Sequence, residues 1–151
     1  MPGYFSEIGY DGNVHQDFIE VAVPTGTDVS GWTVLTYHTD GTLQETFTLG
    51  SSTQTIAGKD VYVVNKDTAG FVDIGATRGY ALVDDTGTVQ QFISFSEAIT
   101  ATEGAAAGQS AQQMGDLTGP GESMETTDGG ATYQAQSTTS KAPLCAMLQA
   151  R

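Results

Sequence analysis

Apolar side chains recur at every second position through most of this sequence, and turn-forming residues interrupt them at short intervals. Ile19, Val21 and Val23 illustrate the pattern, because a two-residue period places all three on one face of a strand. Residues 59–65 are apolar at neighbouring positions, as expected of a strand that is buried on both faces. A period of two fits a pleated strand and not a helix, so the chain is predicted to be all-β.

The same pattern places further strands along the chain, and Gly, Asn and Asp mark the turns between them. The first strand is short and is expected to lie at a sheet edge, and Asp40-Gly41 predicts a two-residue hairpin turn. Residues 50–58 are predicted to be a polar loop, whereas residues 71–74 fit either a strand or a helical turn. The predicted strands are 4–9, 17–23, 32–38, 44–49, 59–65, 80–84, 88–95, 123–127 and 132–136.

The chain has 151 residues, which suits one domain with a two-layer core and no disulfides. Two packed antiparallel sheets bury such alternating strands, so we expect a β-sandwich of about seven to nine strands. The sandwich is assigned to residues 1–136 and a C-terminal tail to residues 137–151, where the strand pattern ends.

Several short motifs occur in a recognisable order near the N-terminus. They are Glu7-Ile8, Tyr10-Asp11, the Asp-Phe-Ile-Glu of residues 17–20, Pro24, and the Val-Ser-Gly-Trp of residues 29–32. In this order they resemble the opening of the lamin tail domain family, bacterial type, and the resemblance extends over residues 4–136. It departs from the family at Ala22-Val23, where members often carry an aromatic residue and Asn. The resemblance implies an immunoglobulin-like β-sandwich.

The formal net charge is −13, and no Lys or Arg precedes Lys59. Binding to phosphates requires a surface rich in Lys and Arg, so direct binding to nucleic acid or to an anionic membrane is disfavoured. No apolar run approaches the ~18 residues of a membrane span. The sequence therefore predicts neither a nucleic-acid-binding nor a membrane-spanning protein.

Residues 1–8 contain neither a basic segment nor an apolar segment of the kind found in signal peptides. The resemblance implies an extracellular or cell-surface location, which this chain would reach by a route without an N-terminal signal peptide. Cytoplasmic residence stays open. The single Cys145 has no second Cys for an internal disulfide.

Residues for catalysis are sparse in this sequence. It has two histidines, His15 and His38, and neither lies in a nucleophile signature such as G-x-S-x-G. One Cys and two separated His do not supply a usual zinc set. Glu7 and Glu20 are expected to be hydrogen-bonded structural carboxylates and not a glycosidase pair. The chain is predicted not to be an enzyme and to need no cofactor other than a candidate calcium ion.

Calcium binds clustered carboxylate and carbonyl oxygens, which this acidic chain supplies. The D-x-N start of residues 11–13 is similar to a calcium loop, although His15 and Gln16 depart from the EF-hand pattern. Asp11, Asn13, Asp17 and Glu20 are the candidate ligands.

The tail contains Leu144, Met147 and Leu148 at i, i+3 and i+4, one face of a short helix, beside Cys145. Two interpretations stay open. The tail is either a frayed terminus, since so short a helix is marginal alone, or a segment that docks on a partner or a second copy.

These observations predict a non-catalytic binding or structural module that mediates protein–protein or cell-surface attachment. A first alternative is a self-assembling subunit of an extracellular polymer or surface layer, because sandwich edges can pair with another copy. A second alternative is an accessory component of an extracellular nuclease or phosphoesterase system, which the family resemblance alone implies.

Overall fold

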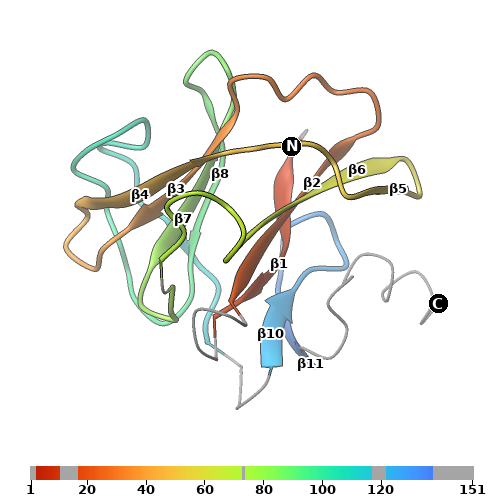
Figure 1. The fold of residues 1–151 in the computed structure, drawn as a ribbon. Helices are drawn as coiled ribbons and strands as arrows, with labels where there is room; N and C mark the ends of the chain where they lie inside the picture. Colours follow the sequence, from red (N-terminus) through yellow and green to blue (C-terminus); the bar gives the residue numbers. More distant parts are fainter. Residues whose placement is uncertain (1–2, 11–16, 73, 117–121, 138–151) are drawn as a thin grey trace.

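The computed structural model describes residues 3–10, 17–72, 74–116 and 122–137. These residues form eleven strands and no helix, arranged in two sheets that pack face to face (Figure 1). The predicted all-β sandwich is confirmed, with more strands than the seven to nine expected. In the described part of the chain, nothing forms an apolar helix of membrane-spanning length.

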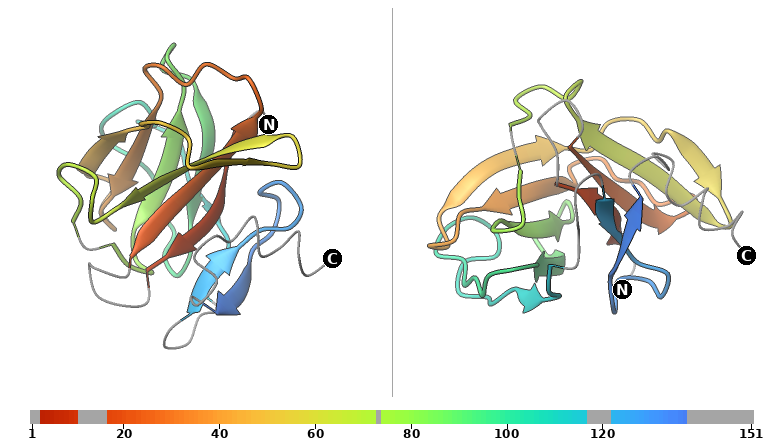
Figure 2. Two further views of the ribbon diagram at one scale, coloured as in Figure 1. Left: turned by 45° about the vertical axis from the view of Figure 1, so that its right-hand side comes forward. Right: turned by 90° about the horizontal axis from the view of Figure 1, so that it is seen from below.

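The first sheet has six strands in the order β11-β10-β1-β2-β6-β5, and every neighbouring pair is antiparallel. Its strands are β1 (Tyr4–Gly9), β2 (Phe18–Pro24), β5 (Gln54–Ile56), β6 (Lys59–Asn65), β10 (Glu122–Glu125) and β11 (Gln134–Ser137). The prediction that the first strand lies at an edge is wrong, because β1 pairs with β2 on one side and β10 on the other. Figure 2 shows the hairpin of β10 and β11 beside β1.

The second sheet has five strands in the order β4-β3-β7-β8-β9. Its strands are β3 (Thr33–Tyr37), β4 (Leu43–Thr48), β7 (Gly79–Val83), β8 (Val89–Ser94) and β9 (Gln112–Gln113). All pairs are antiparallel except β8 with β9, which is parallel. Residues 71, 72 and 74 belong to no strand or helical turn, and β5 lies within the segment predicted to be a loop.

The main core lies between the two sheets. Ile19, Val21 and Val23 are fully buried in it, which confirms the predicted inner face of β2, and Trp32 covers its end at 6 % exposure. Val63 of β6 is only half-buried, so that strand is not equally buried on both faces. Aromatic rings join the sheets, with Phe5 of β1 meeting Tyr80 of β7 edge-on at a centroid distance of 6.4 Å.

A second apolar cluster covers the outer face of the five-stranded sheet. Leu35, Tyr37 and Phe92 of this face pack with residues from the segment 99–106. The segment is also tied to the β3–β4 hairpin, since the Thr102 amide donates to the Gly41 carbonyl at 2.8 Å. Gly41 has φ +87°, and a Cβ there would lie 2.0 Å from the Thr100 carbonyl oxygen, so the close approach requires glycine.

Candidate functional site

Strand β4 is the longest edge strand of the sandwich in the part of the chain that the structure describes. It has six residues, whereas the other edge strands β11, β5 and β9 have four, three and two. Unpaired edges invite another strand, and proteins commonly protect them with Lys, Pro or short length. β4 contains neither Lys nor Pro. This edge is therefore available for pairing, and Figure 1 shows it at the margin of the five-stranded sheet.

The alternation of backbone hydrogen bonds along β4 shows which of its residues direct their backbone groups away from β3. The Leu49 amide donates to the Trp32 carbonyl at 3.3 Å, so alternate residues of β4 beyond it bond to β3. Phe47 and Glu45 therefore direct their backbone N–H and C=O groups toward β3. Thr46 and Thr48, which alternate with them, direct theirs away from β3. Both threonine side chains are exposed. The backbone N–H and C=O groups of Thr46 and Thr48 thus point outward, where an added strand can pair with them. We call these two residues the threonine rung.

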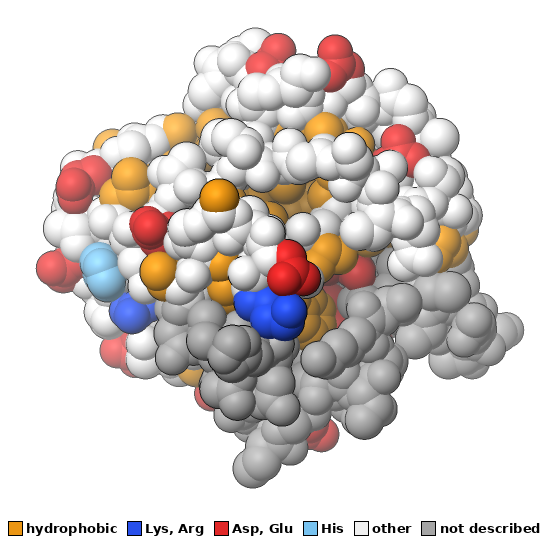
Figure 3. All heavy atoms as spheres, in the orientation of Figure 1, with side chains coloured by type: hydrophobic (Ala, Val, Ile, Leu, Met, Phe, Trp, Pro, Cys, Tyr) orange, Lys and Arg blue, Asp and Glu red, His pale blue; other side chains and the backbone are white. Residues whose placement is uncertain are grey.

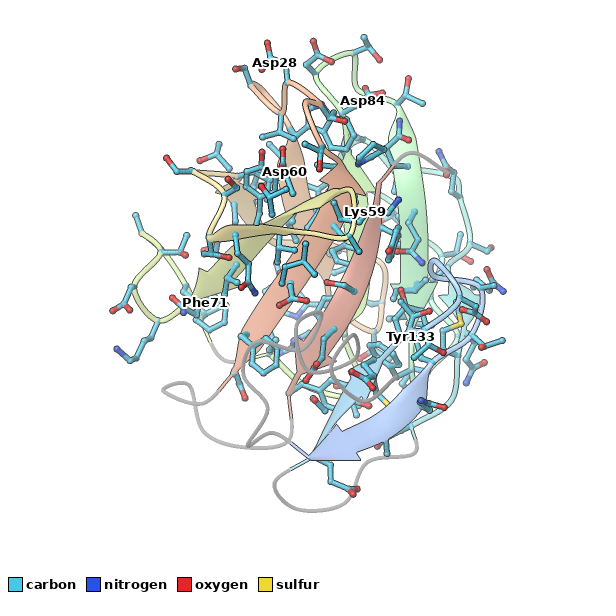
Figure 4. All side chains as sticks on the ribbon, turned by 90° about the vertical axis from the view of Figure 1, so that its right-hand side faces the viewer. Asp28, Lys59, Asp60, Phe71, Asp84 and Tyr133 are labelled. Carbon is cyan, nitrogen blue, oxygen red and sulfur yellow. The ribbon has the colours of Figure 1, made fainter. Side chains whose placement is uncertain are left out.

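Apolar side chains border this edge. Phe47 of β4 is buried and its ring lies 5.6 Å from that of Phe71, which is only partly buried. Leu49, just beyond β4, is also partly buried against the main core. Phe71 lies beyond the end of β6, in the segment that leads to the second sheet (Figure 4). A strand added to β4 would find apolar contacts next to its backbone partners.

Acidic side chains lie at the hairpin end of β4. Glu45 is half-buried on the strand and Asp40 is exposed in the hairpin turn. The carboxylate of Glu103 accepts a hydrogen bond from the Leu43 amide at 3.3 Å, which places a third negative charge at the start of the strand. Figure 3 shows acidic side chains at this end of the molecule together with a histidine and a basic side chain. Arg78 lies beside His38 of the same hairpin, so the edge is neutral at its threonine rung, and three carboxylates face one arginine at its hairpin end.

Three glutamates form a separate cluster on adjacent strands of the six-stranded sheet. Glu7 of β1 stands opposite Glu20 of β2 and Glu125 of β10, and the three are 0 %, 1 % and 3 % exposed. The Ser6 hydroxyl donates to Glu20 Oε1 at 2.6 Å, and the Ser123 hydroxyl donates to Glu7 Oε2. This confirms Glu7 and Glu20 as hydrogen-bonded carboxyl groups.

Glu7 is the most strongly perturbed member of this carboxyl cluster. Burial raises the pKa of Glu7 to about 9, and the negative charges of Glu20 and Glu125 add to the rise against the lowering effect of the Ser123 hydrogen bond. Its Oε1 atom is buried without a hydrogen-bond partner among the described residues. Glu7 is therefore a neutral carboxylic acid at pH 7.

Of the four calcium candidates, the structure describes Asp17 and Glu20, and it places them on opposite faces of the sheet. Asp17 accepts a hydrogen bond from the Ile74 amide at 3.4 Å, and its charge acts on Tyr80 between the sheets. Glu20 lies three positions later, on the opposite face of β2 beside Ser6. Asp11 and Asn13 lie outside the described residues, within which no three His, Cys, Asp or Glu side chains are grouped to hold a metal.

Other aspartates shape the turns in which they occur. Asp28 accepts from the Ser30 amide, and Asp84 accepts from the amides of Thr86 and Thr88. Both lie at one end of the sandwich (Figure 4). Hydrogen bonds from Thr132 and Thr126 lower the pKa of Asp128 to about 2. These carboxylates have a local role in turns, as short Asx motifs do.

The cations of the described residues are scattered. Lys66 forms an ion pair with Asp67 at 3.1 Å, Lys59 lies 5.6 Å from the ring centre of Tyr4, and Arg78 Nη1 lies 3.2 Å from His38 Nδ1. Because Arg only donates, His38 Nδ1 is the acceptor of this hydrogen bond. His15 and the tail residues Leu144, Cys145, Met147 and Leu148 lie outside the described residues.

A buried polar network that the sequence did not reveal joins the two sheets. Gln91 of β8 accepts from the Phe5 amide at 2.8 Å and donates to the Gly130 carbonyl at 3.1 Å. Tyr133 donates to the Phe5 carbonyl at 2.6 Å and also contacts the Gln91 side chain. The only sequence signal was a Gln in an otherwise alternating strand. No sequence signal placed residues 44–49 at a sheet edge, because strand order depends on pairing between distant segments.

Comparison with known proteins found no matching family model, no matching curated protein and no matching solved structure.

Proposed function

We propose that this protein is a non-catalytic interaction module that binds a partner protein along the free edge of β4. The observation that carries the proposal is the outward direction of the backbone groups of Thr46 and Thr48, which lie at a sheet edge where no other described strand pairs with them. Backbone groups at such an edge supply affinity when an extended peptide adds to the sheet.

The surroundings of the edge support this proposal. Phe71 and Leu49 provide partly buried apolar surface beside the rung. The hairpin that starts β4 is fixed by the contact of Thr102 with Gly41, so the strand is held in place before a partner arrives. A preorganised edge lowers the ordering cost of binding.

The lamin-tail resemblance supports the same class of function. It implies an immunoglobulin-like sandwich with an attachment role at the cell surface, and we propose both for this chain. Self-assembly into a polymer is the second candidate, since two β4 edges can pair with each other. Light scattering of the full chain separates the two functions, because self-assembly alone raises its mass with concentration.

The test compares proteins captured by the wild-type chain with those captured by two variants of Thr46. Thr46→Pro removes the outward N–H, and proline is tolerated at such an edge position, so the fold is retained. Thr46→Val keeps the N–H and the branched side chain as the matched control. We expect the partner to be captured by the wild type and by Thr46→Val, and lost with Thr46→Pro.

Equal melting temperatures of the three chains show that the variants are folded. Identical capture by all three would show that the β4 edge is not the binding site and would overturn the proposal.

A further inference from the structure

The chemistry around β4 also specifies the segment that would bind there. Resting on the proposed function, we infer that the partner contributes an extended segment bearing Lys or Arg, added as an antiparallel strand to β4. Antiparallel addition uses both the N–H and the C=O of Thr46 and of Thr48 in closely spaced pairs.

The charge argument starts from the acidic residues that flank the rung. Glu45, Asp40 and Glu103 lie at the hairpin end of β4 and outnumber Arg78, which lies beside His38 of the same hairpin. The ion pair of Lys66 with Asp67 is formed elsewhere. The chain carries 18 acidic residues against 5 basic ones. An approaching basic segment is attracted at long range and finds carboxylates next to the strand it joins.

A second copy of the chain fits this edge less well. A two-fold antiparallel pair of β4 strands centred on Thr46 or on Phe47 keeps the threonine rungs in phase. Either arrangement brings the Glu45 carboxylates of both copies to one interface, with an Asp40 at each end of it, and each copy has a net charge of −13. Like charges at an interface oppose association, so a partner of opposite charge is favoured.

The apolar border adds a second requirement. Alternate side chains of an added strand point to one face of the sheet, and on the inner face they would meet Phe71 and Leu49, which are only partly buried. The best segment therefore alternates a branched apolar residue with a basic one, with the apolar residues directed toward the space between the sheets.

The experiment uses the full chain and three nine-residue peptides with blocked ends. One alternates Val with Lys, one alternates Val with Glu, and one has the same number of Lys among Gly and Ser. Binding is followed by NMR at low salt, through the amide signals of Thr46 and Thr48. We expect the Val–Lys peptide to bind about tenfold or more tighter than either of the others, because only it meets both requirements.

Two pairs of variants locate the binding. Thr46→Pro should weaken Val–Lys binding about tenfold or more, as the removal of an edge hydrogen bond and a steric block predict, whereas Thr46→Val should not. Glu103→Gln should weaken it about two- to fivefold, because Glu103 lies at the start of β4 beside the outer face on which the Lys side chains would lie. Asp85→Asn, in the exposed β7–β8 turn, makes the same change in net charge and should have a smaller effect.

The outcomes separate this inference from the proposed function. If partner capture is lost in Thr46→Pro while the Val–Lys peptide binds no better than Val–Glu, the interaction module stands and the basic segment is wrong. If the Lys-Gly-Ser peptide binds as well as Val–Lys, the attraction is electrostatic only and strand addition is wrong. A concentration-dependent mass that Thr46→Pro abolishes would identify a second copy as the occupant and overturn the inference.

Discussion

Both sheets bury residues on their outer faces, but the chemistry of these buried residues differs. On the five-stranded sheet, Leu35 and Tyr37 pack against Ile99 and the alanines around it. On the six-stranded sheet, the carboxyl groups of three glutamates stand side by side on adjacent strands. Covering an apolar outer face stabilises the fold. Burying a carboxyl face destabilises the fold unless the charges are removed or hydrogen-bonded.

The largest effect is expected from breaking the apolar face. Tyr37 is fully buried and its hydroxyl donates to the Glu103 carbonyl at 2.9 Å. Tyr37→Ala should lower the free energy of unfolding by about 3–5 kcal/mol, because it leaves a cavity under the covering segment. Urea unfolding measures the change. Tyr37→Phe, which loses only the hydrogen bond, should cost about 1 kcal/mol, and equal losses in the two variants would contradict the role of packing.

The carboxyl face should respond to pH. The pKa of Glu7 is about 9 in the folded protein, above its ordinary value of 4.5, so the folded state binds more protons between these limits. The contribution of Glu7 to stability is complete below about pH 4.5, falls as the pH rises, and levels off above about pH 9. Glu7→Gln should remove this slope and raise the free energy of unfolding at pH 8 by about 1–3 kcal/mol.

Thermal unfolding of both chains from pH 5 to pH 9 provides the measurement. Glu103→Gln, at an exposed position, is the control and should leave the slope unchanged. A Glu7→Gln chain that keeps the wild-type pH dependence would mean that Glu7 is ionised in the fold.

A smaller effect is expected where the two sheets are joined. Tyr133→Phe removes the donor to the Phe5 carbonyl and one contact of Gln91. The loss should be about 1–2 kcal/mol, since a buried carbonyl loses its side-chain partner while the ring remains packed. Chemical denaturation measures the change. A denaturation midpoint equal to that of the wild type would contradict the stabilising role of the network.

The smallest expected effect concerns nucleic acid, for which we predict no binding of duplex DNA at physiological salt. Among the described residues, Lys59, Lys66 and Arg78 contact three different neighbours and form no basic surface on either sheet. Approach to a polyanion is repulsive for a chain of net charge −13. A gel shift at micromolar protein would refute this prediction.

The sequence predicted most strands because alternation is a local property. Strands 4–9 and 59–65 have the predicted bounds, and the others differ by a residue or two at their ends. The predicted two-residue turn at Asp40-Gly41 is longer, since the His38 amide bonds to the Thr42 carbonyl. β5 and β9 were not predicted, because strands of two or three residues carry too little periodicity.

The sites were harder to predict than the strands, because they depend on pairing between distant segments. Alternation along the sequence predicted that Glu20 points away from the face of Ile19 and Val21. Only the order of the strands shows that Glu7 lies between Glu20 and Glu125. Likewise, alternation within residues 44–49 does not show that this strand lies at an edge. Periodicity reports which face a residue occupies, and the order of strands in the sheet decides what it meets.

The central position of β1 has a consequence for how the chain acquires its structure. β1 is synthesised before the other described strands, yet the Phe5 carbonyl accepts a hydrogen bond from Tyr133, which lies 128 residues later in the chain. Until β10 emerges, one side of β1 has no partner, and the nascent chain exposes a temporary edge next to buried residues such as Ile8. Such distant closure slows folding and prolongs exposure to aggregation. Pairing of β10 with β1 therefore removes this temporary edge and ends the period in which the nascent six-stranded sheet is exposed to misassembly.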